Sequence, residues 1–104
     1  MSGTNPKNGT KIVDEYYRLS KRSKYPVEEL VPLSSLKQGQ KGKLVFALGE
    51  PGTIRRLCDL GLIPETEVRV LKKGSAGGPV MLEVRSSEIV IGSEIASKVL
   101  VKPL

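Results

Sequence analysis

Residues 53–68, TIRRLCDLGLIPETEV, have the pattern of a short helix, its stop signal and the start of a strand. Four residues share the spacing i, i+3, i+4, i+7 of a helix face that packs on a core: Ile54, Leu57, Cys58 and Gly61. Thr53 is placed to cap a helix over residues 54–60, and Gly61 is placed to end it in the left-handed conformation. Pro64 blocks any extension. The stretch therefore predicts a short helix that leads directly into a strand.

Short apolar segments lie on both sides of this helix. Alternating or mixed apolar patterns predict five strands, over residues 42–48, 67–72, 80–85, 88–91 and 99–101. In two of these strands the alternation predicts the inward-facing side chains: Val68 and Val70 in one, and Val80, Leu82 and Val84 in the other. Residues 49–52 and 74–79 are rich in Gly and Pro and predict loops, and Ser86-Ser87 predicts a tight turn. Residues 92–97 predict a single helical turn capped by Ser93. Short strands joined by turns indicate a mainly β fold, a closed or nearly closed small barrel.

The composition changes near residue 30. Residues 1–10 are small, polar or basic and predict a flexible leader. Residues 11–22 repeat apolar side chains at helical spacing and predict a short amphipathic helix, whose apolar positions are Ile12, Val13, Tyr16 and Tyr17. We therefore divide the chain into a leader with a helix (1–30) and a barrel domain (31–104). The helix could dock on the barrel, join two chains into a homo-oligomer or lie on a membrane; its short, half-apolar face favours the first two.

The composition excludes most catalytic and metal-dependent classes. The 104 residues include no His and one Cys, so the commonest general base and the commonest transition-metal ligand are both missing. Cys58 is interpreted as a packing thiol. The acids Glu83, Glu88 and Glu94 are the best candidates for a hard cation, but solvated surface carboxylates are the favoured interpretation. The sequence predicts no catalytic residue, no metal ligand and no evident cofactor.

The sequence predicts neither a membrane-spanning helix nor a signal peptide. No apolar run approaches the length of a membrane-spanning helix, which is roughly 18 residues, and residues 1–6 lack the apolar centre of a signal peptide. We therefore expect a soluble, cytoplasmic protein without a membrane span.

Positive charge is the remaining functional signal. The chain has 17 basic and 11 acidic residues, a net charge of +6, which favours an anionic protein partner, a membrane surface or nucleic acid. Arg55 and Arg56 are adjacent on the predicted helix, and Lys72 and Lys73 border a glycine-rich loop that lacks the Gly-Lys-Ser/Thr of a phosphate loop. These four residues are the predicted partner-binding site. Nucleic-acid binding is the weaker alternative, because Phe46 is the only aromatic side chain of the barrel region available to stack on bases.

Residues 53–68 resemble the signature of the ferrous iron transport protein A (FeoA) family: an Arg-rich helix, then Leu-Gly-Leu, then a turn into a strand. Glu65 stands where the family commonly has Gly. Residues 32–42 resemble the opening of the family and residues 92–101 its closing turn and strand. The resemblance covers about residues 31–104.

The resemblance implies a barrel similar to Src-homology-3 (SH3) domains with a helix inserted after the first strand. It implies a small cytoplasmic accessory protein for ferrous iron uptake that contacts the membrane GTPase permease, ferrous iron transport protein B. It also implies weak or transient binding of Fe²⁺, because transition-metal binding is associated with the family. A related module forms the last domain of iron-dependent repressors, so the resemblance implies a metal-binding regulatory domain as a further alternative.

Overall fold

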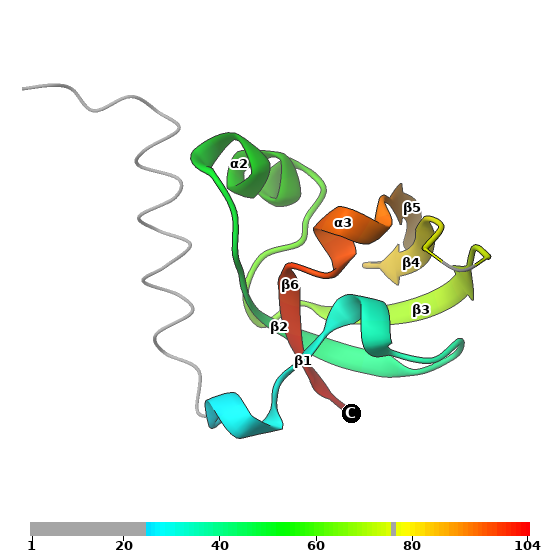
Figure 1. Ribbon diagram of the computed structural model, residues 1–104, viewed down its shortest axis with the longest axis horizontal. Coiled ribbons are helices and arrows are strands. Elements are labelled where there is room, and N and C mark those ends of the chain that lie inside the picture. Colours follow the sequence, from blue (N-terminus) through cyan, green and yellow to red (C-terminus); the bar gives the residue numbers. More distant parts are fainter. Residues whose placement is uncertain (1–24, 76) are drawn as a thin grey trace, which may run out of the picture.

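The computed structural model describes residues 25–75 and 77–104 (Figure 1). The amphipathic helix predicted over residues 11–22, and the leader before it, lie outside these residues. The described part is mainly β. Its strands are β1 Val31–Pro32, β2 Lys41–Ala47, β3 Glu67–Lys73, β4 Val80–Val84, β5 Ser87–Ile91 and β6 Val99–Pro103. Its helices are α2 Pro51–Asp59 and α3 Ser93–Ala96, with 3₁₀ turns η1 Val27–Glu29 and η2 Leu33–Ser35.

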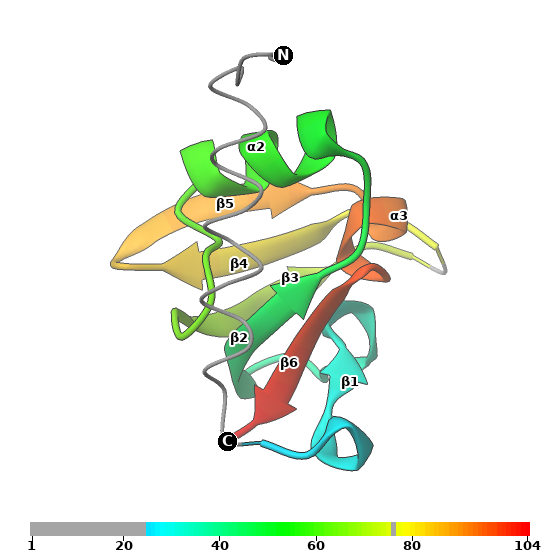
Figure 2. The same cartoon turned by 90° about the vertical axis from the view of Figure 1, so that its left-hand side faces the viewer.

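The strands form one antiparallel sheet in the order β1-β6-β2-β3-β4-β5. Figure 2 shows this order from β5 at the top to β1 at the lower right, with the strand direction turning across the sheet. Two register shifts, between Leu44 and Phe46 in β2 and between Val70 and Lys72 in β3, add local bends. Each of the five predicted strand positions is occupied, with ends that differ by at most two residues.

The predicted closure of the barrel is wrong for the described residues, because the sheet is open with β1 and β5 as its edges. The sequence missed β1, since a strand of only two residues, Val31–Pro32, shows no alternation. Pro32 also lacks a backbone N–H and suits an edge. At this end of the sheet, η2 packs against β6 and α3. Because β1 comes first in the chain, α2 follows the second strand rather than the first.

The core is aliphatic and lies inside the curved sheet. Alternation placed the inward side chains correctly: Val68 and Val70 of β3 are buried, as are the three predicted residues of β4, Val80, Leu82 and Val84. Ile54 and Leu57 bury the inner face of α2 in the same cluster, and Phe46 packs at its margin. Burial of these apolar surfaces is the main stabilising contribution to the domain.

The two ends of α2 differ in how well they were predicted. The helix begins at Pro51 with Glu50 as its N-cap and no side-chain cap, so the predicted cap at Thr53 and start at residue 54 are wrong. Proline is favoured at the first helical position. The C-terminal prediction is confirmed. Gly61 has φ +84°, and the Gly61 and Leu62 N–H groups donate to the carbonyls of Cys58 and Leu57 at 3.0 and 2.8 Å, which is a Schellman motif.

Candidate functional site

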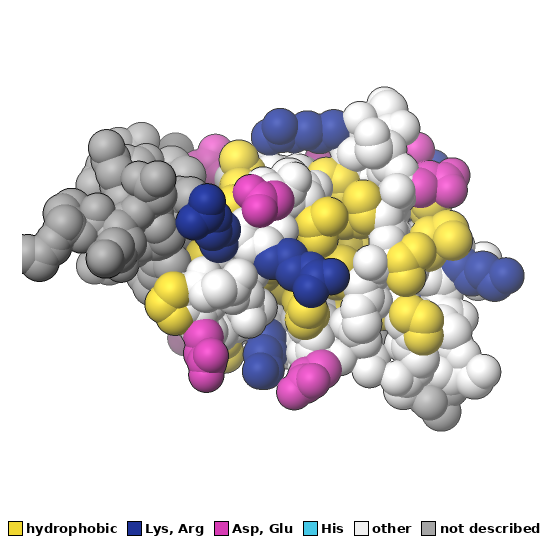
Figure 3. All heavy atoms as spheres, turned by 90° about the horizontal axis from the view of Figure 1, so that it is seen from above, with side chains coloured by type: hydrophobic (Ala, Val, Ile, Leu, Met, Phe, Trp, Pro, Cys, Tyr) yellow, Lys and Arg dark blue, Asp and Glu magenta, His cyan; other side chains and the backbone are white. Residues whose placement is uncertain are grey.

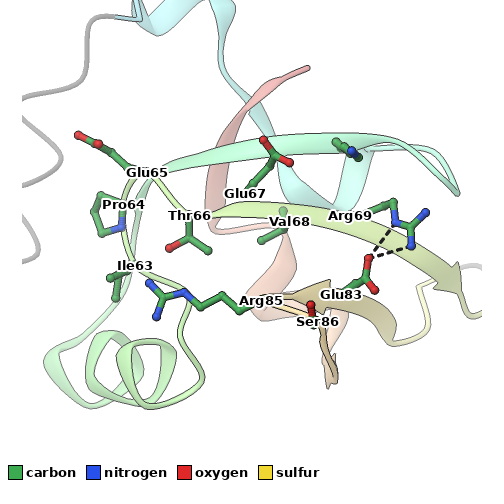
Figure 4. A pocket seen from close by; sticks show the side chains of 11 residues that line it. Ile63, Pro64, Glu65, Thr66, Glu67, Val68, Arg69, Glu83, Arg85 and Ser86 are labelled. Carbon is green, nitrogen blue, oxygen red and sulfur yellow. Dashed lines mark hydrogen bonds and ion pairs between the residues drawn. The ribbon is translucent and has the colours of Figure 1, made fainter.

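A pocket of about 540 Å³ opens beside the loop that leads from α2 into β3 (Figure 4). It is lined by residues 63–69, by Lys41 of β2 and by Glu83, Arg85 and Ser86 at the end of β4. We call it the β4–β5 turn pocket. The helix stop at Gly61 and Pro64 directs the chain along this side of the sheet, and the β4–β5 hairpin supplies the opposite wall.

An ion pair crosses the outer wall of the pocket. The Arg69 guanidinium donates to one carboxylate oxygen of Glu83, from Nη2 at 2.8 Å and from Nε at 3.1 Å. The two residues face each other in the β3–β4 register. Their side chains are 42% and 38% exposed, so solvent limits the stabilisation to about 0.2–1 kcal/mol. The pair joins β3 to β4 and partly neutralises both charges at this wall.

The turn between β4 and β5 has an unusual backbone. Val84 and Ser87 are paired, so the loop consists of Arg85 and Ser86, whose φ angles are +53° and +67°. The predicted turn at Ser86-Ser87 is therefore displaced by one residue. Two-residue hairpin loops of this kind favour Asn-Gly, because both central residues need positive φ. Neither residue here is Gly or Asn, so the turn stores backbone strain on the order of 1–3 kcal/mol for each residue.

Thr66 is the only polar side chain among the described residues that is classed as buried, with 7% of its surface exposed. Its backbone is satisfied: the N–H donates to the Ile63 carbonyl at 3.2 Å and the carbonyl accepts from the Leu44 N–H at 2.8 Å. Its hydroxyl makes no hydrogen bond within residues 25–75 and 77–104. Figure 4 shows this hydroxyl turned into the space beside Ile63 and the guanidinium of Arg85.

The structure separates the four predicted partner-binding residues into two pairs. The side chains of Arg55 and Arg56, the α2 basic pair, are exposed and make no hydrogen bond or ion pair with any other described residue. Lys72 and Lys73, the hairpin basic pair, lie at the end of β3, where the Lys73 ammonium donates to the Ser34 carbonyl at 2.8 Å. Figure 1 shows α2 and the β3–β4 hairpin toward opposite ends of the domain. The two pairs therefore form two separate surfaces.

Basic, acidic and apolar side chains are interspersed on the face shown in Figure 3. A protein that tracks a nucleic-acid backbone needs a continuous stripe of basic groups. The basic groups on this face do not form such a stripe. On this face the positive charge is therefore divided among separate side chains.

Cys58 lies on α2 between the core and the surface and forms no disulfide. Burial, and to a smaller extent the neighbouring Asp59 carboxylate, raise the pKa of this thiol. A raised pKa keeps the thiol protonated near neutral pH, so Cys58 is a poor nucleophile and a poor metal ligand. This supports its interpretation as a packing residue.

The described residues do not fit a transition-metal centre. No group of three His, Cys, Asp or Glu side chains comes together in residues 25–75 and 77–104. The acids Glu83, Glu88 and Glu94 do not form such a group either, and Glu83 is engaged by Arg69. No helix in the described part of the chain is long and apolar enough to cross a membrane.

The fold and these surfaces define a small, mainly β domain of the SH3-like class. The model of the FeoA domain family matches residues 31–103. The chain belongs to the FeoA family, which links it to ferrous iron transport. No curated protein matches the chain significantly.

Solved structures agree with this assignment. A crystal structure of an iron uptake regulatory protein (FeoA) is 33% identical over 72% of this chain and 99% of its own, with a TM-score of 0.68. The FeoA protein from Chlorobium tepidum is 28% identical over 71% of this chain and 70% of its own, with a TM-score of 0.67. A manganese-dependent transcriptional repressor in complex with manganese is 20% identical, with a TM-score of 0.70. That match covers 76% of this chain and only 39% of the repressor, and it shows the fold alone.

Sequence reasoning missed the two most unusual residues of the pocket, Thr66 and Arg85. The local pattern carries no signal for either of them. Thr66 stands in a turn, where a threonine is ordinarily solvated. An Arg-Ser pair does not predict positive φ angles, which favour Gly, Asn or Asp. Their roles depend on how the loop after α2 meets the β4–β5 hairpin.

Proposed function

We propose that the protein is a non-enzymatic, cytoplasmic accessory protein for ferrous iron uptake that acts by contact with the cytoplasmic domain of the membrane GTPase permease. The observation that carries this proposal is the FeoA domain match over residues 31–103. In this role Fe²⁺ is the cargo of the permease, and the accessory domain needs no tight metal site of its own.

The α2 basic pair is the proposed main contact. Arg55 and Arg56 are exposed on a helix that is anchored through Ile54 and Leu57, and no described acid neutralises them. Two adjacent, uncompensated guanidinium groups on a rigid element suit a carboxylate-bearing protein surface. The hairpin basic pair, at the other end of the domain, is the proposed second contact.

The proposal is tested by titrating the chain with the soluble GTPase domain of the permease from the same organism. We expect association at low salt that weakens as salt rises, because charges at an interface rim act mainly through long-range attraction. The double reversal Arg55→Glu and Arg56→Glu should weaken binding by about tenfold or more, which corresponds to about 1.4 kcal/mol. The melting temperature should stay nearly unchanged, because both side chains are exposed and unpaired.

A matched control carries the same charge change elsewhere. Lys37 and Lys98 are also exposed, so the variant with Lys37→Glu and Lys98→Glu separates a local contact from a general effect of net charge. Equal loss of binding in the two variants would reject the α2 surface. Absence of any association at low salt would reject the permease as the partner.

The likeness to the manganese-dependent repressor supports a second candidate, a metal-responsive regulatory domain. It rests on the shared fold, and no described residues form a metal-binding group. Calorimetric titration with Mn²⁺ or Fe²⁺ under reducing, anaerobic conditions distinguishes the two. Stoichiometric binding heat would favour the regulatory domain over the contact function.

A further inference from the structure

We propose that the β4–β5 turn pocket is a binding site for a carboxylate that is attached to an apolar group. The carboxylate would be bound by the Arg85 guanidinium and the Thr66 hydroxyl. This site is separate from the α2 basic pair, and the inference does not depend on which protein partner α2 contacts.

The first observation is the hydroxyl of Thr66. A buried polar group without a hydrogen bond is rare in folded proteins, because it has lost its water and gained no partner in return. The Thr66 hydroxyl has no partner among the described residues, although 93% of the residue's surface is buried (7% is exposed). Figure 4 shows it turned into the pocket, where a ligand could accept a hydrogen bond from it.

The second observation is the strained turn. Arg85 and Ser86 both adopt positive φ, at +53° and +67°, where Asn-Gly would relieve the strain. Backbone strain of this kind is concentrated at functional sites of proteins. Here the turn directs the Arg85 side chain into the pocket, so that its guanidinium faces the same space as the Thr66 hydroxyl (Figure 4).

The third observation is that the charge of Arg85 is available. Three carboxylates line the pocket, Glu65, Glu67 and Glu83, but no described residue forms an ion pair with Arg85. Glu83 is occupied by Arg69 at 2.8 Å. Figure 4 shows the side chains of Glu65 and Glu67 directed away from the guanidinium.

These groups select the class of ligand. A guanidinium offers two parallel N–H donors that match the two oxygens of a carboxylate, and the threonine hydroxyl adds a third donor. Ile63 and Pro64 form an apolar border next to the donors, which suits an apolar group beside the carboxylate. The three lining carboxylates disfavour a more highly charged anion such as phosphate. The carboxylate could belong to the end of a peptide or to an acidic side chain.

The test is a titration of the full chain, labelled with ¹⁵N and followed by NMR, with small probes. N-acetylleucine presents a chain-end carboxylate, and N-acetylglutamic acid α-amide presents a side-chain carboxylate. Their uncharged counterparts, N-acetylleucinamide and N-acetylglutamine amide, serve as controls, together with inorganic phosphate. We expect saturable shifts of the Ile63, Thr66, Arg85 and Ser86 amide signals with one or both carboxylates. The probe that binds more tightly identifies the source of the carboxylate.

Two variants test the assigned residues. Arg85→Asn removes the guanidinium and suits the left-handed backbone, so we expect about tenfold weaker binding in a folded domain. Thr66→Val keeps the shape and removes the hydroxyl, so we expect about threefold to tenfold weaker binding together with a higher melting temperature. The control Lys98→Gln removes one exposed positive charge and should bind as the original chain does.

Three results would overturn the proposal. One is equal shifts with the carboxylates and their amides. Another is binding of phosphate as tight as that of the carboxylates. The last is that Arg85→Asn weakens binding of the carboxylates no more than Lys98→Gln does. None of these results bears on the permease titration, so failure here leaves the proposed function standing.

Discussion

At the scale of single residues, Cys58 shows how position on a helix sets chemistry. It follows Leu57, which is buried, and precedes Asp59, which is exposed. Partial burial removes water from the thiol, and the adjacent carboxylate disfavours a second negative charge. Both effects raise the pKa of the thiol. The sole cysteine of the chain is therefore held in its unreactive form.

This shift predicts how the stability of the domain depends on pH. The pKa of Cys58 is higher in the folded chain than its ordinary value of 9.0, so the folded state favours the protonated thiol. The resulting stabilisation is fully present below the unfolded pKa and is lost as pH rises through the folded pKa. Urea denaturation between pH 8 and 11 should show a smaller decline in Cys58→Ala than in the original chain.

Alkylation gives an independent measurement of the same thiol. Iodoacetamide at pH 7.5 should modify Cys58 more slowly than it modifies glutathione, and urea should remove the difference. Modification as fast as that of a free thiol in the folded chain would contradict the raised pKa.

At the scale of elements, α2 is defined by its two ends. Its start is set by Pro51 at the first helical position and its end by Gly61 in the left-handed conformation. The end is the more important, because it directs the chain into the loop that forms one wall of the β4–β5 turn pocket. Gly61 makes this possible at little cost, since it has no Cβ.

Two glycines of the same region allow a matched test of this role. Gly61→Ala places a Cβ 3.8 Å from Val84 Cγ1, which is an ordinary contact. The free-energy cost of the substitution therefore comes from holding alanine at a φ of +84°. We expect a loss of about 1 kcal/mol in the free energy of unfolding.

Gly52 lies inside α2, and a Cβ there meets nothing within 4 Å. Gly52→Ala should therefore stabilise the domain by about 0.5 kcal/mol, because alanine has the better helix propensity. Urea denaturation of both variants provides the measurement. A stabilising Gly61→Ala would show that the Schellman end is not needed.

At the scale of the whole molecule, the open sheet predicts a gradient of local stability. The strands β6, β2, β3 and β4 have hydrogen-bonded neighbours on both sides, whereas β1 and β5 have one neighbour each within residues 25–75 and 77–104. In amide hydrogen exchange we expect the slowest exchange in β2 and β3 and fast exchange at alternate residues of β5. Uniformly slow exchange throughout β5 would contradict an open edge.

Local patterns in the chain were enough to predict the strands and the core. Alternation predicted the inward faces of β3 and β4, because successive side chains of a strand point to opposite faces whatever the sheet contains. Gly61 and Pro64 located the end of α2, since their backbone preferences act within a few residues. The motif in residues 53–68 was enough to indicate the family.

Long-range packing decided the rest. The open edges depend on β1 pairing with β6, two segments from opposite ends of the domain, and no local pattern encodes such a pairing. The positive φ angles at Arg85 and Ser86 arise because Val84 and Ser87 pair and leave two residues for the turn. The unpaired Thr66 hydroxyl and the separation of the α2 and hairpin basic pairs likewise follow from how distant elements meet. Contacts between residues far apart in the chain cannot be deduced from preferences that act only between neighbours.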